Sequence, residues 1–200
     1  MWGGSPARQV GETVKILVAC YSETGNTAKV AGTIQDEVAS LGHEAHLKAL
    51  GDLTPGALPF YDLIFLGSAC HDADLAKPVK RLLEEIPPSP GFKLAGFATH
   101  ATYAPGGSDA EQEAYATWAS RCPRSFQQAC EERGIDFLGY WSCQGAPSPP
   151  IEQFIRNTIV TDEDEWKEYS RAVRRRPDRE DLRHAREFAR QVLAGAQEHS

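Results

Sequence analysis

Six consecutive residues near the N-terminus, Ser22-Glu23-Thr24-Gly25-Asn26-Thr27, carry the most specific chemical signal in the sequence. Three of them bear hydroxyl groups, which donate hydrogen bonds without carrying charge, and Gly25 permits a close backbone approach or a positive φ. The hexad lies between an apolar run at 14–19 and a helical pattern at 30–41, so it opens a helix. The free N–H groups of a first helical turn bind anions, because the helix dipole favours negative charge there. The hexad therefore predicts a phosphate-binding loop.

The residues of this loop exclude the two commonest nucleotide-binding motifs. The sequence has no Gly-Lys-Ser/Thr of a triphosphatase here and no G-x-G-x-x-G of a dinucleotide fold. The hexad contains no Lys or Arg, so amides and hydroxyls alone must hold the anion. This favours a phosphate that stays bound, since a phosphate being transferred develops charge that needs cations or a metal. The alternative is a plain strand–helix turn with capping hydroxyls.

Histidine and cysteine residues also follow predicted strands. His71 and His100 are candidate proton donors, because histidine titrates near neutral pH. Cys70 and Cys143 lie at strand ends as well, but the five cysteines form no C-x-x-C pair and no zinc-ligand spacing, so we expect no metal site. Their odd number argues against a disulfide framework and favours reduced thiols.

The elements that must position these residues alternate between strand and helix. Apolar runs predict buried strands at 14–19, 61–68, 93–99 and 135–143, and a weaker alternation predicts one at 44–50. Between them apolar residues recur at helical spacing, and Ser108 to Glu111 is a capping box that opens a long helix with a kink or restart at Pro123. This order predicts an α/β fold, a doubly wound five-stranded parallel sheet with helices on both faces.

Ligands of such sheets bind beyond the carboxyl ends of the strands, at the point where the strand order reverses. Three loops would meet there: the first loop (22–27), the second loop (68–74) and the third loop (99–107).

The alternation breaks beyond Cys143. A Pro-rich linker at 145–150 precedes a short helix and then a capped one, before a closing helix at 178–194. We interpret 145–176 as an insertion that Trp166 and Phe154 pack against the domain, because it is too short for a core of its own. Residues 1–200 are therefore expected to form a single domain.

Composition narrows the function further. The net charge is −7, and residues 1–150 carry 11 Lys/Arg against 17 Asp/Glu, which argues against nucleic acid and favours a basic protein partner. No apolar run approaches the roughly 18 residues of a membrane span, and the N-terminus lacks the apolar core of a signal peptide. We therefore expect a cytoplasmic protein that does not enter membranes.

The pattern Ser/Thr-x-Thr-Gly-x-Thr after a first strand, seen here at Ser22 to Thr27, resembles the FMN-phosphate loop of the flavodoxin family. The resemblance covers about residues 14–144 and the closing helix, although only the first loop is motif-specific. It implies the strand order 2-1-3-4-5 and FMN as the cofactor, with Tyr103 stacked on one flavin face. The implied contacts come from all three loops: Ser22, Glu23, Thr24, Gly25, Asn26, Thr27, Ser68, Ala69, Cys70, His71, Thr99, His100, Ala101, Tyr103, Gly106 and Gly107.

The second loop departs from the family pattern. Family members often place an aromatic residue and a glycine there, whereas this chain has Cys70-His71-Asp72. One face of the ring would then be less shielded, which bears on the choice between a carrier and an enzyme.

Three functions fit these observations. The favoured one is an FMN-binding electron-transfer protein that cycles the flavin between redox states and passes electrons between protein partners. These partners would dock at an acidic rim, formed by Asp72, Asp74, Asp109, Glu111 and Glu113. The alternative is an FMN-dependent NAD(P)H:quinone or small-molecule reductase, favoured by the unusual second loop and by the insertion, which could overhang the flavin. The third is a flavin-free binding module on the same fold. The sequence does not indicate an oligomeric state.

Overall fold

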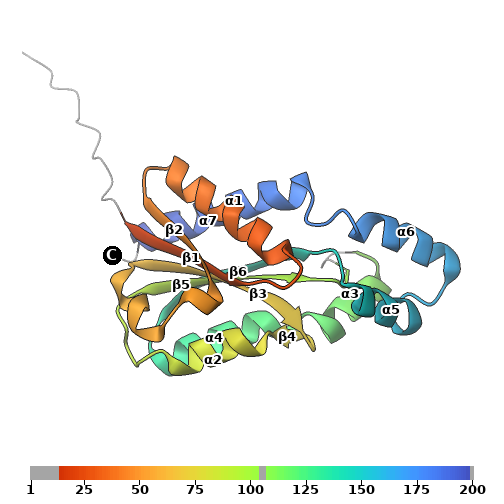
Figure 1. Ribbon diagram of the computed structural model, residues 1–200, viewed down its shortest axis with the longest axis horizontal. Coiled ribbons are helices and arrows are strands. Elements are labelled where there is room, and N and C mark those ends of the chain that lie inside the picture. Colours follow the sequence, from red (N-terminus) through yellow and green to blue (C-terminus); the bar gives the residue numbers. More distant parts are fainter. Residues whose placement is uncertain (1–13, 104–106, 199–200) are drawn as a thin grey trace, which may run out of the picture.

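The computed structural model describes residues 14–103 and 107–198 and centres on a parallel β-sheet (Figure 1). The strand order is β2-β1-β3-β5-β6, with a short sixth strand, β4, paired antiparallel to the end of β3. The strands span Lys15–Tyr21 (β1), Glu44–Ala49 (β2), Leu63–His71 (β3), Asp74–Leu75 (β4), Lys93–His100 (β5) and Asp136–Gln144 (β6). Without β4, this is the predicted order 2-1-3-4-5, so the predicted fold class is confirmed. The two-residue strand β4 was not predicted.

The central strands are apolar because helices cover them on both sides. Residues 16–19 of β1 are fully buried, and residues 63–66 of the neighbouring strand β3 are at most 1 % exposed. Strands buried on both faces have continuous apolar runs, which is why periodicity finds them easily. The strand β2 lies at the edge of the sheet, and its pattern is correspondingly weaker.

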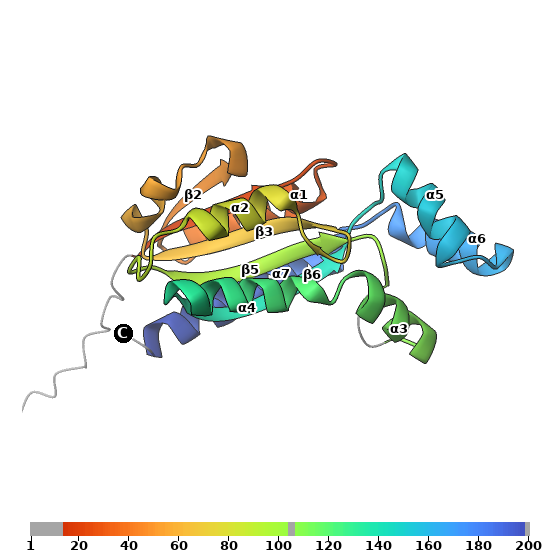
Figure 2. The same cartoon turned by 90° about the horizontal axis from the view of Figure 1, so that it is seen from below.

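Two helices cover each face of the sheet (Figures 1 and 2). On one face lie α1 (Asn26–Ser40) and α7 (Arg179–Glu198), which bury Val30, Ile34 and Phe188 against β1 and β3. The opposite face carries α2 (Lys77–Glu85) and α4 (Arg121–Arg133), which bury Val79 and Phe126. Two short 3-10 helices, η1 (Leu50–Asp52) and η2 (Pro55–Phe60), connect β2 to β3.

The predicted long helix after the third loop is two helices. The first is α3 (Asp109–Trp118), which begins with the predicted capping box of Ser108 and Glu111. The chain breaks at Ala119 and Ser120, and α4 restarts at Arg121 with Pro123 in its first turn. A proline is tolerated in a first turn because its missing N–H would have no helical partner there.

The insertion forms a helical hairpin, α5 (Pro149–Thr158) and α6 (Glu163–Val173), which projects beyond the sheet next to the α3 end (Figure 2). Contrary to our expectation, it has a small hydrophobic cluster of its own: Ile155, Val160, Trp166, Tyr169 and Val173. Ala101 and Tyr103 of the third loop complete this cluster. Phe154 is 40 % exposed and contacts Trp118 of α3, with the ring centroids 5.2 Å apart. Within the described residues, no helix is both long and apolar enough to cross a lipid bilayer.

Candidate cofactor-binding site

A cavity of about 400 Å³ lies beyond the carboxyl ends of β1, β3 and β5. All three predicted loops contribute to its wall, as the position of the strand ends requires. Nine of the predicted contact residues line it: Glu23, Thr24, Asn26, Ala69, Cys70, His71, Thr99, His100 and Ala101.

The first loop presents the N-terminus of α1 to this cavity. Gly25 precedes the helix with φ +88°, and no atom lies within 4 Å of the position that a Cβ would occupy. The Ser22 hydroxyl accepts a hydrogen bond from the N–H of Ala28, at 3.2 Å. The other first-turn N–H groups have no acceptor within the helix, so they remain available to an anion.

The remaining side chains of the first loop divide between the cavity and the interior. The Asn26 amide donates to Thr24 Oγ1 at 2.9 Å and to the carbonyl of Ala146 at 2.8 Å, so it joins the first loop to the segment after β6. Thr27 is buried, and its hydroxyl pairs with that of Thr99 at 2.8 Å. Thr27 therefore links the first loop to the end of β5 and does not line the cavity.

The second loop forms the opposite wall. Ser68 is fully buried and holds the backbone, because its Oγ accepts from the N–H of Ala76 at 2.9 Å and donates to the carbonyl of Ala69 at 2.7 Å. His71 Nε2 lies 3.0 Å from Glu23 Oε2, which bridges the first and second loops. Asp72 and Ala73 both adopt positive φ, at 51° and 66°. This wall carries no aromatic side chain, as the sequence indicated.

The third loop contributes a buried imidazole. His100 is 4 % exposed, and its Nδ1 lies 3.2 Å from the carbonyl of Thr102. Burial lowers the pKa of His100 to about 4, so the ring is neutral at pH 7. A neutral ring that pairs with a carbonyl carries its proton on Nδ1, which leaves Nε2 as an acceptor. Among the described residues Nε2 has no hydrogen-bond partner. At neutral pH His100 is therefore equipped to accept a hydrogen bond.

Two other predicted residues of the third loop, Tyr103 and Gly107, do not line the cavity. The ring of Tyr103 meets that of Tyr169 edge-on, with centroids 5.2 Å apart, and the Tyr169 hydroxyl donates to the carbonyl of Ala101. Gly107 is exposed beside Glu111. Gly106 lies outside the described residues. The stacking of Tyr103 on a flavin therefore stays a prediction.

A fourth segment, residues 145–151, lines the cavity and was missing from the predicted contacts. Gly145 donates its N–H to the carbonyl of His100 at 2.8 Å, and Ala146 donates to the carbonyl of Arg176 at 3.1 Å. A Cβ at position 145 would lie 2.8 Å from Asn26 Nδ2, so glycine permits the close approach to the first loop. The only signal in the sequence was the Pro-rich linker, which stiffens the chain as it leaves the last strand.

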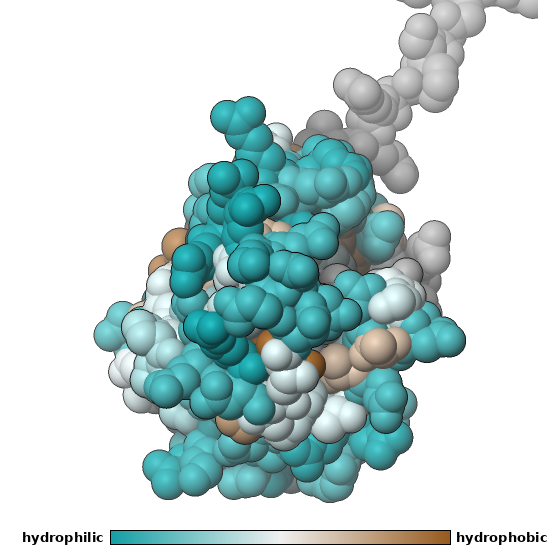
Figure 3. Space-filling view, turned by 90° about the vertical axis from the view of Figure 1, so that its right-hand side faces the viewer, coloured by the Kyte–Doolittle hydropathy of each residue, from teal (hydrophilic) through white to brown (hydrophobic). Residues whose placement is uncertain are grey.

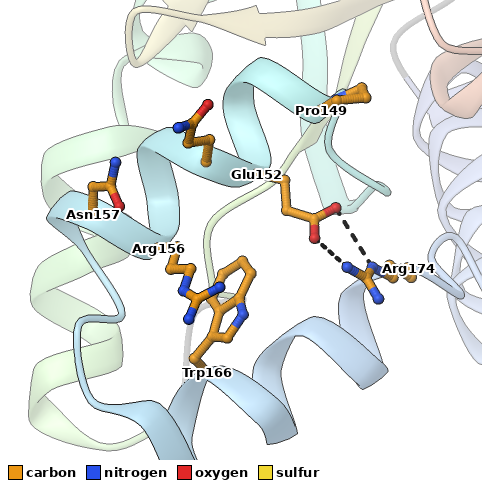
Figure 4. Close-up of a pocket in the computed structure, with 7 residues that line it drawn as sticks. Pro149, Glu152, Arg156, Asn157, Trp166 and Arg174 are labelled. Atoms are coloured by element: carbon orange, nitrogen blue, oxygen red, sulfur yellow. Dashed lines mark hydrogen bonds and ion pairs between the residues drawn. The ribbon is translucent and has the colours of Figure 1, made fainter.

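A second hollow, of about 640 Å³, lies between α5 and α6 (Figure 4). Its charged side chains pair with each other or with neighbours: Glu152 with Arg174, and Arg156 with Glu163. The Arg156 guanidinium also lies 5.7 Å from the centre of the Trp166 ring. These contacts hold the hairpin together and leave the cavity at the strand ends as the candidate site.

Comparison with known proteins identifies the fold family. A model of the flavodoxin domain matches residues 17–190. No curated protein matches the sequence closely enough to count as a relative.

Solved structures give the same result. Oxidised flavodoxin 1 of Bacillus cereus has a TM-score of 0.58 at 17 % identity, over 90 % of this chain and 97 % of that one. Flavodoxin 2 of Bacillus cereus has a TM-score of 0.54 at 22 % identity, over 90 % and 98 % of the two chains. Rubredoxin:oxygen oxidoreductase of Desulfovibrio gigas has a TM-score of 0.54 at 12 % identity, and the match covers 90 % of this chain but 36 % of that larger protein. At such identities these likenesses concern the fold.

The first loop suits the phosphate of FMN. The left-handed Gly25 and the open N-terminus of α1 leave backbone N–H groups for a phosphate monoester. Residues 17–190 make up most of the chain, and they match the domain model as one stretch. This chain belongs to the flavodoxin domain family, and its cofactor is FMN.

Proposed function

We propose that this protein is an electron carrier, which accepts electrons from one protein and passes them to another through bound FMN. One observation supports this proposal most directly. In a chain that matches the flavodoxin domain, the N-terminus of α1, at Gly25, faces the cavity at the strand ends. FMN supplies one- and two-electron redox chemistry, and the protein supplies binding, orientation and electrostatics.

The first loop would hold the phosphate without a cation. Its donors are the first-turn backbone N–H groups of α1 and the Thr24 hydroxyl, which the Asn26 amide holds in place at 2.9 Å. Lys29, in the same turn, donates to the carbonyl of Pro177 at 2.5 Å, so its ammonium group is turned toward the start of α7. A phosphate held by neutral donors stays in place through many turnovers, as a resident cofactor must.

His100 would orient the ring. The residue lines the cavity, and a small rotation of the buried neutral ring would present Nε2 as an acceptor to an N–H group of the flavin. The second loop would contact the other part of the ring through the backbone around Cys70 and His71. The odd number of cysteines, five, supports a reducing compartment such as the cytoplasm.

Protein partners would dock at the acidic rim. Asp72 lies at the cavity, and Asp109 and Glu113 are exposed on the adjacent helix α3. Asp74 contributes less negative charge to this rim than the sequence suggested, because its carboxylate pairs with Lys80 and accepts a hydrogen bond from Ser125 Oγ at 2.6 Å. A negative rim around a redox cofactor attracts basic partners by long-range steering.

Substitutions in the first loop test the cofactor site. Thr24→Val removes a hydroxyl donor, and Gly25→Leu forces a branched side chain into a left-handed conformation, so both variants should lose FMN during gel filtration. Thr54→Val, an exposed threonine before η2, serves as the control and should retain it. Flavin absorbance per protein measures the outcome, and a full yellow complement in Gly25→Leu would refute the proposed site.

A second candidate, an FMN-dependent NAD(P)H:quinone or small-molecule reductase, is favoured by the insertion. Pro150 and Ile151 line the cavity, and Ile151 is 47 % exposed, so an apolar surface stands at the opening. This end of the molecule is otherwise largely hydrophilic, with a few small apolar areas (Figure 3). Anaerobic mixing with NADPH alone decides between the two: rapid bleaching of the flavin supports the reductase, and no bleaching supports the carrier.

A further inference from the structure

Two cysteines from distant parts of the sequence lie in one packed region behind the wall of the cavity. Cys70 lies near the end of β3 and lines the cavity, whereas Cys122 lies in the first turn of α4 and is fully buried. Cys122 belongs to the hydrophobic cluster under α2 and α4, and Cys70 packs against the same cluster. Hydrogen bonding to Cys70, together with burial, raises the pKa of the Cys122 thiol well above its usual range.

The surrounding backbone fixes this arrangement. Arg121, the residue before Cys122, donates its N–H to the carbonyl of Ala73 at 3.2 Å and its guanidinium to the carbonyl of Asp72. One turn further along α4, Ser125 donates to Asp74. The turn that follows Cys70 is thus bound to the helical turn that carries Cys122. Cys70 also donates to the carbonyl of Trp118, at 3.6 Å.

The other three cysteines are placed differently. Cys20, Cys130 and Cys143 are buried, and desolvation is the main cause of their raised pKa. None of these three lines the cavity. They behave as small apolar side chains, which is the usual role of a buried thiol.

We propose that Cys70 and Cys122 form a reversible dithiol–disulfide couple that exchanges electron pairs with the FMN in the adjoining cavity. The exchange with FMN rests on the proposed function. In one direction the two S–H bonds break, one S–S bond forms, and the two electrons and two protons reduce oxidised FMN. In the other direction reduced FMN returns them, and the S–S bond breaks. Cys70 is the member that faces the cavity, so it is the one that also meets external thiols and disulfides.

The couple would double the electron capacity of the site. A dithiol–disulfide pair stores two electrons, as flavin does, so the fully oxidised protein should accept four electrons per chain. Such a store lets a carrier that receives electrons one at a time deliver them in pairs.

The first experiment concerns the thiols alone. The full chain, free of FMN, is equilibrated in glutathione buffers of increasing oxidised fraction, alkylated, and mapped by mass spectrometry. We expect the alkylated forms of Cys70 and Cys122 to disappear together, at one midpoint of the oxidised glutathione fraction. The two residues should then appear as a disulfide-linked peptide pair, while the other three cysteines stay alkylated. Cys130→Ser should leave this result unchanged. Five alkylated cysteines in every buffer, or glutathione attached to Cys70 without the linked pair, would overturn the proposal.

The second experiment counts electrons in the FMN-loaded protein. Anaerobic titration of the oxidised form should consume twice as many electrons per flavin as it does in Cys122→Ala or Cys70→Ser. Cys70→Ser removes the other thiol of the pair, which is only half-buried. It therefore tests the couple even if Cys122→Ala disturbs folding. A protein that binds FMN but consumes the same number of electrons with and without Cys122 refutes the couple and leaves the proposed function intact. Failure to bind FMN at all refutes the proposed function and the exchange with flavin, while the thiol mapping still reports on the pair.

Discussion

Gly25 has a conformation that other residues reach only with strain. Its φ is +88°, whereas Gly32, inside α1, has ordinary helical geometry, and at both positions a Cβ would meet no atom within 4 Å. The two glycines therefore isolate the effect of backbone conformation from that of packing.

We expect opposite results from the same substitution at these two positions. Gly25→Ala should lower the free energy of unfolding by about 1–2 kcal/mol, because alanine is disfavoured in the left-handed region. Gly32→Ala should raise it by about 0.5–1 kcal/mol, because alanine loses less entropy in a helix. Urea unfolding of the FMN-free protein measures both, and equal shifts would show that the turn relaxes to accommodate a side chain.

His100 makes the stability of the protein depend on pH. Its pKa is about 4 in the folded protein and about 6.5 in an unfolded chain, so between these values only the unfolded chain binds the proton. Stability should therefore fall as the pH drops from 6.5 toward 4, by about 3 kcal/mol in total from this group. His100→Gln should flatten this part of the profile, and His184→Gln on α7 should not. Parallel profiles for wild type and His100→Gln would contradict the assignment.

Some residue-level features could be read from the sequence and others could not. The hexad at 22–27 was found because its function depends on local backbone, which residue types specify directly. Ser68 and Thr27 were expected to contact the cofactor, but neither lines the cavity, because both hydroxyls pair with groups that only the fold brings close. The packing of Cys70 and Cys122 at one cluster was missed for the same reason, since their spacing in sequence matches no motif.

At the scale of the elements, the insertion is joined to the domain through the third loop. Its cluster around Trp166 and Tyr169 is separate from the two clusters on the faces of the sheet. Separate clusters can open independently, so the hairpin and the sheet are expected to differ in local stability.

Trp166→Ala should therefore loosen α5 and α6 without unfolding the sheet. We expect faster hydrogen exchange throughout 149–173, equivalent to a local loss of about 3–5 kcal/mol, with little change in the exchange of β1 and β3. Phe126→Ala, which creates a cavity under α4, is the matched comparison and should lower the stability of the whole domain by about 3–5 kcal/mol. A loss of protection in β1 for Trp166→Ala would mean that hairpin and sheet unfold together.

The sequence predicted the elements that bury apolar residues in a regular pattern, including all five parallel strands. It missed β4, since two residues are too few to show a period. It predicted a kink or restart of the long helix at Pro123, and the break lies just before that residue, at Ala119 and Ser120, because polar residues such as Ser120 do not by themselves interrupt helical spacing. It placed the insertion but missed its cluster, because an amphipathic helix does not reveal which surface its apolar face contacts.

For the molecule as a whole, two groups of exposed acidic side chains, on α3 and at the end of α4, lie at different distances from the cavity. The exposed acidic side chains of α3 stand at the end of the molecule that carries the three loops, while those at the end of α4 stand at the opposite edge of the sheet (Figure 2). A basic partner approaching from solution should therefore be drawn toward the cofactor.

Reversing charge at Asp109 and Glu113 should slow electron transfer from the reduced protein to cytochrome c, used as a basic probe. At low ionic strength we expect a loss of roughly tenfold, which should shrink as salt screens the surface. Glu131→Lys with Glu132→Lys makes the same change in net charge at the far end of α4 and should have a smaller effect. Equal effects of the two double variants would argue against a directed docking site.

The second loop is bonded to α4 through the carbonyls of Asp72 and Ala73, so contacts within the protein itself set the shape of this wall. A wall whose shape is set in advance requires little ordering when the cofactor docks, so the entropy lost on association should be small at this side. Tight retention of the prosthetic group would then reflect preorganisation as much as the number of contacts made.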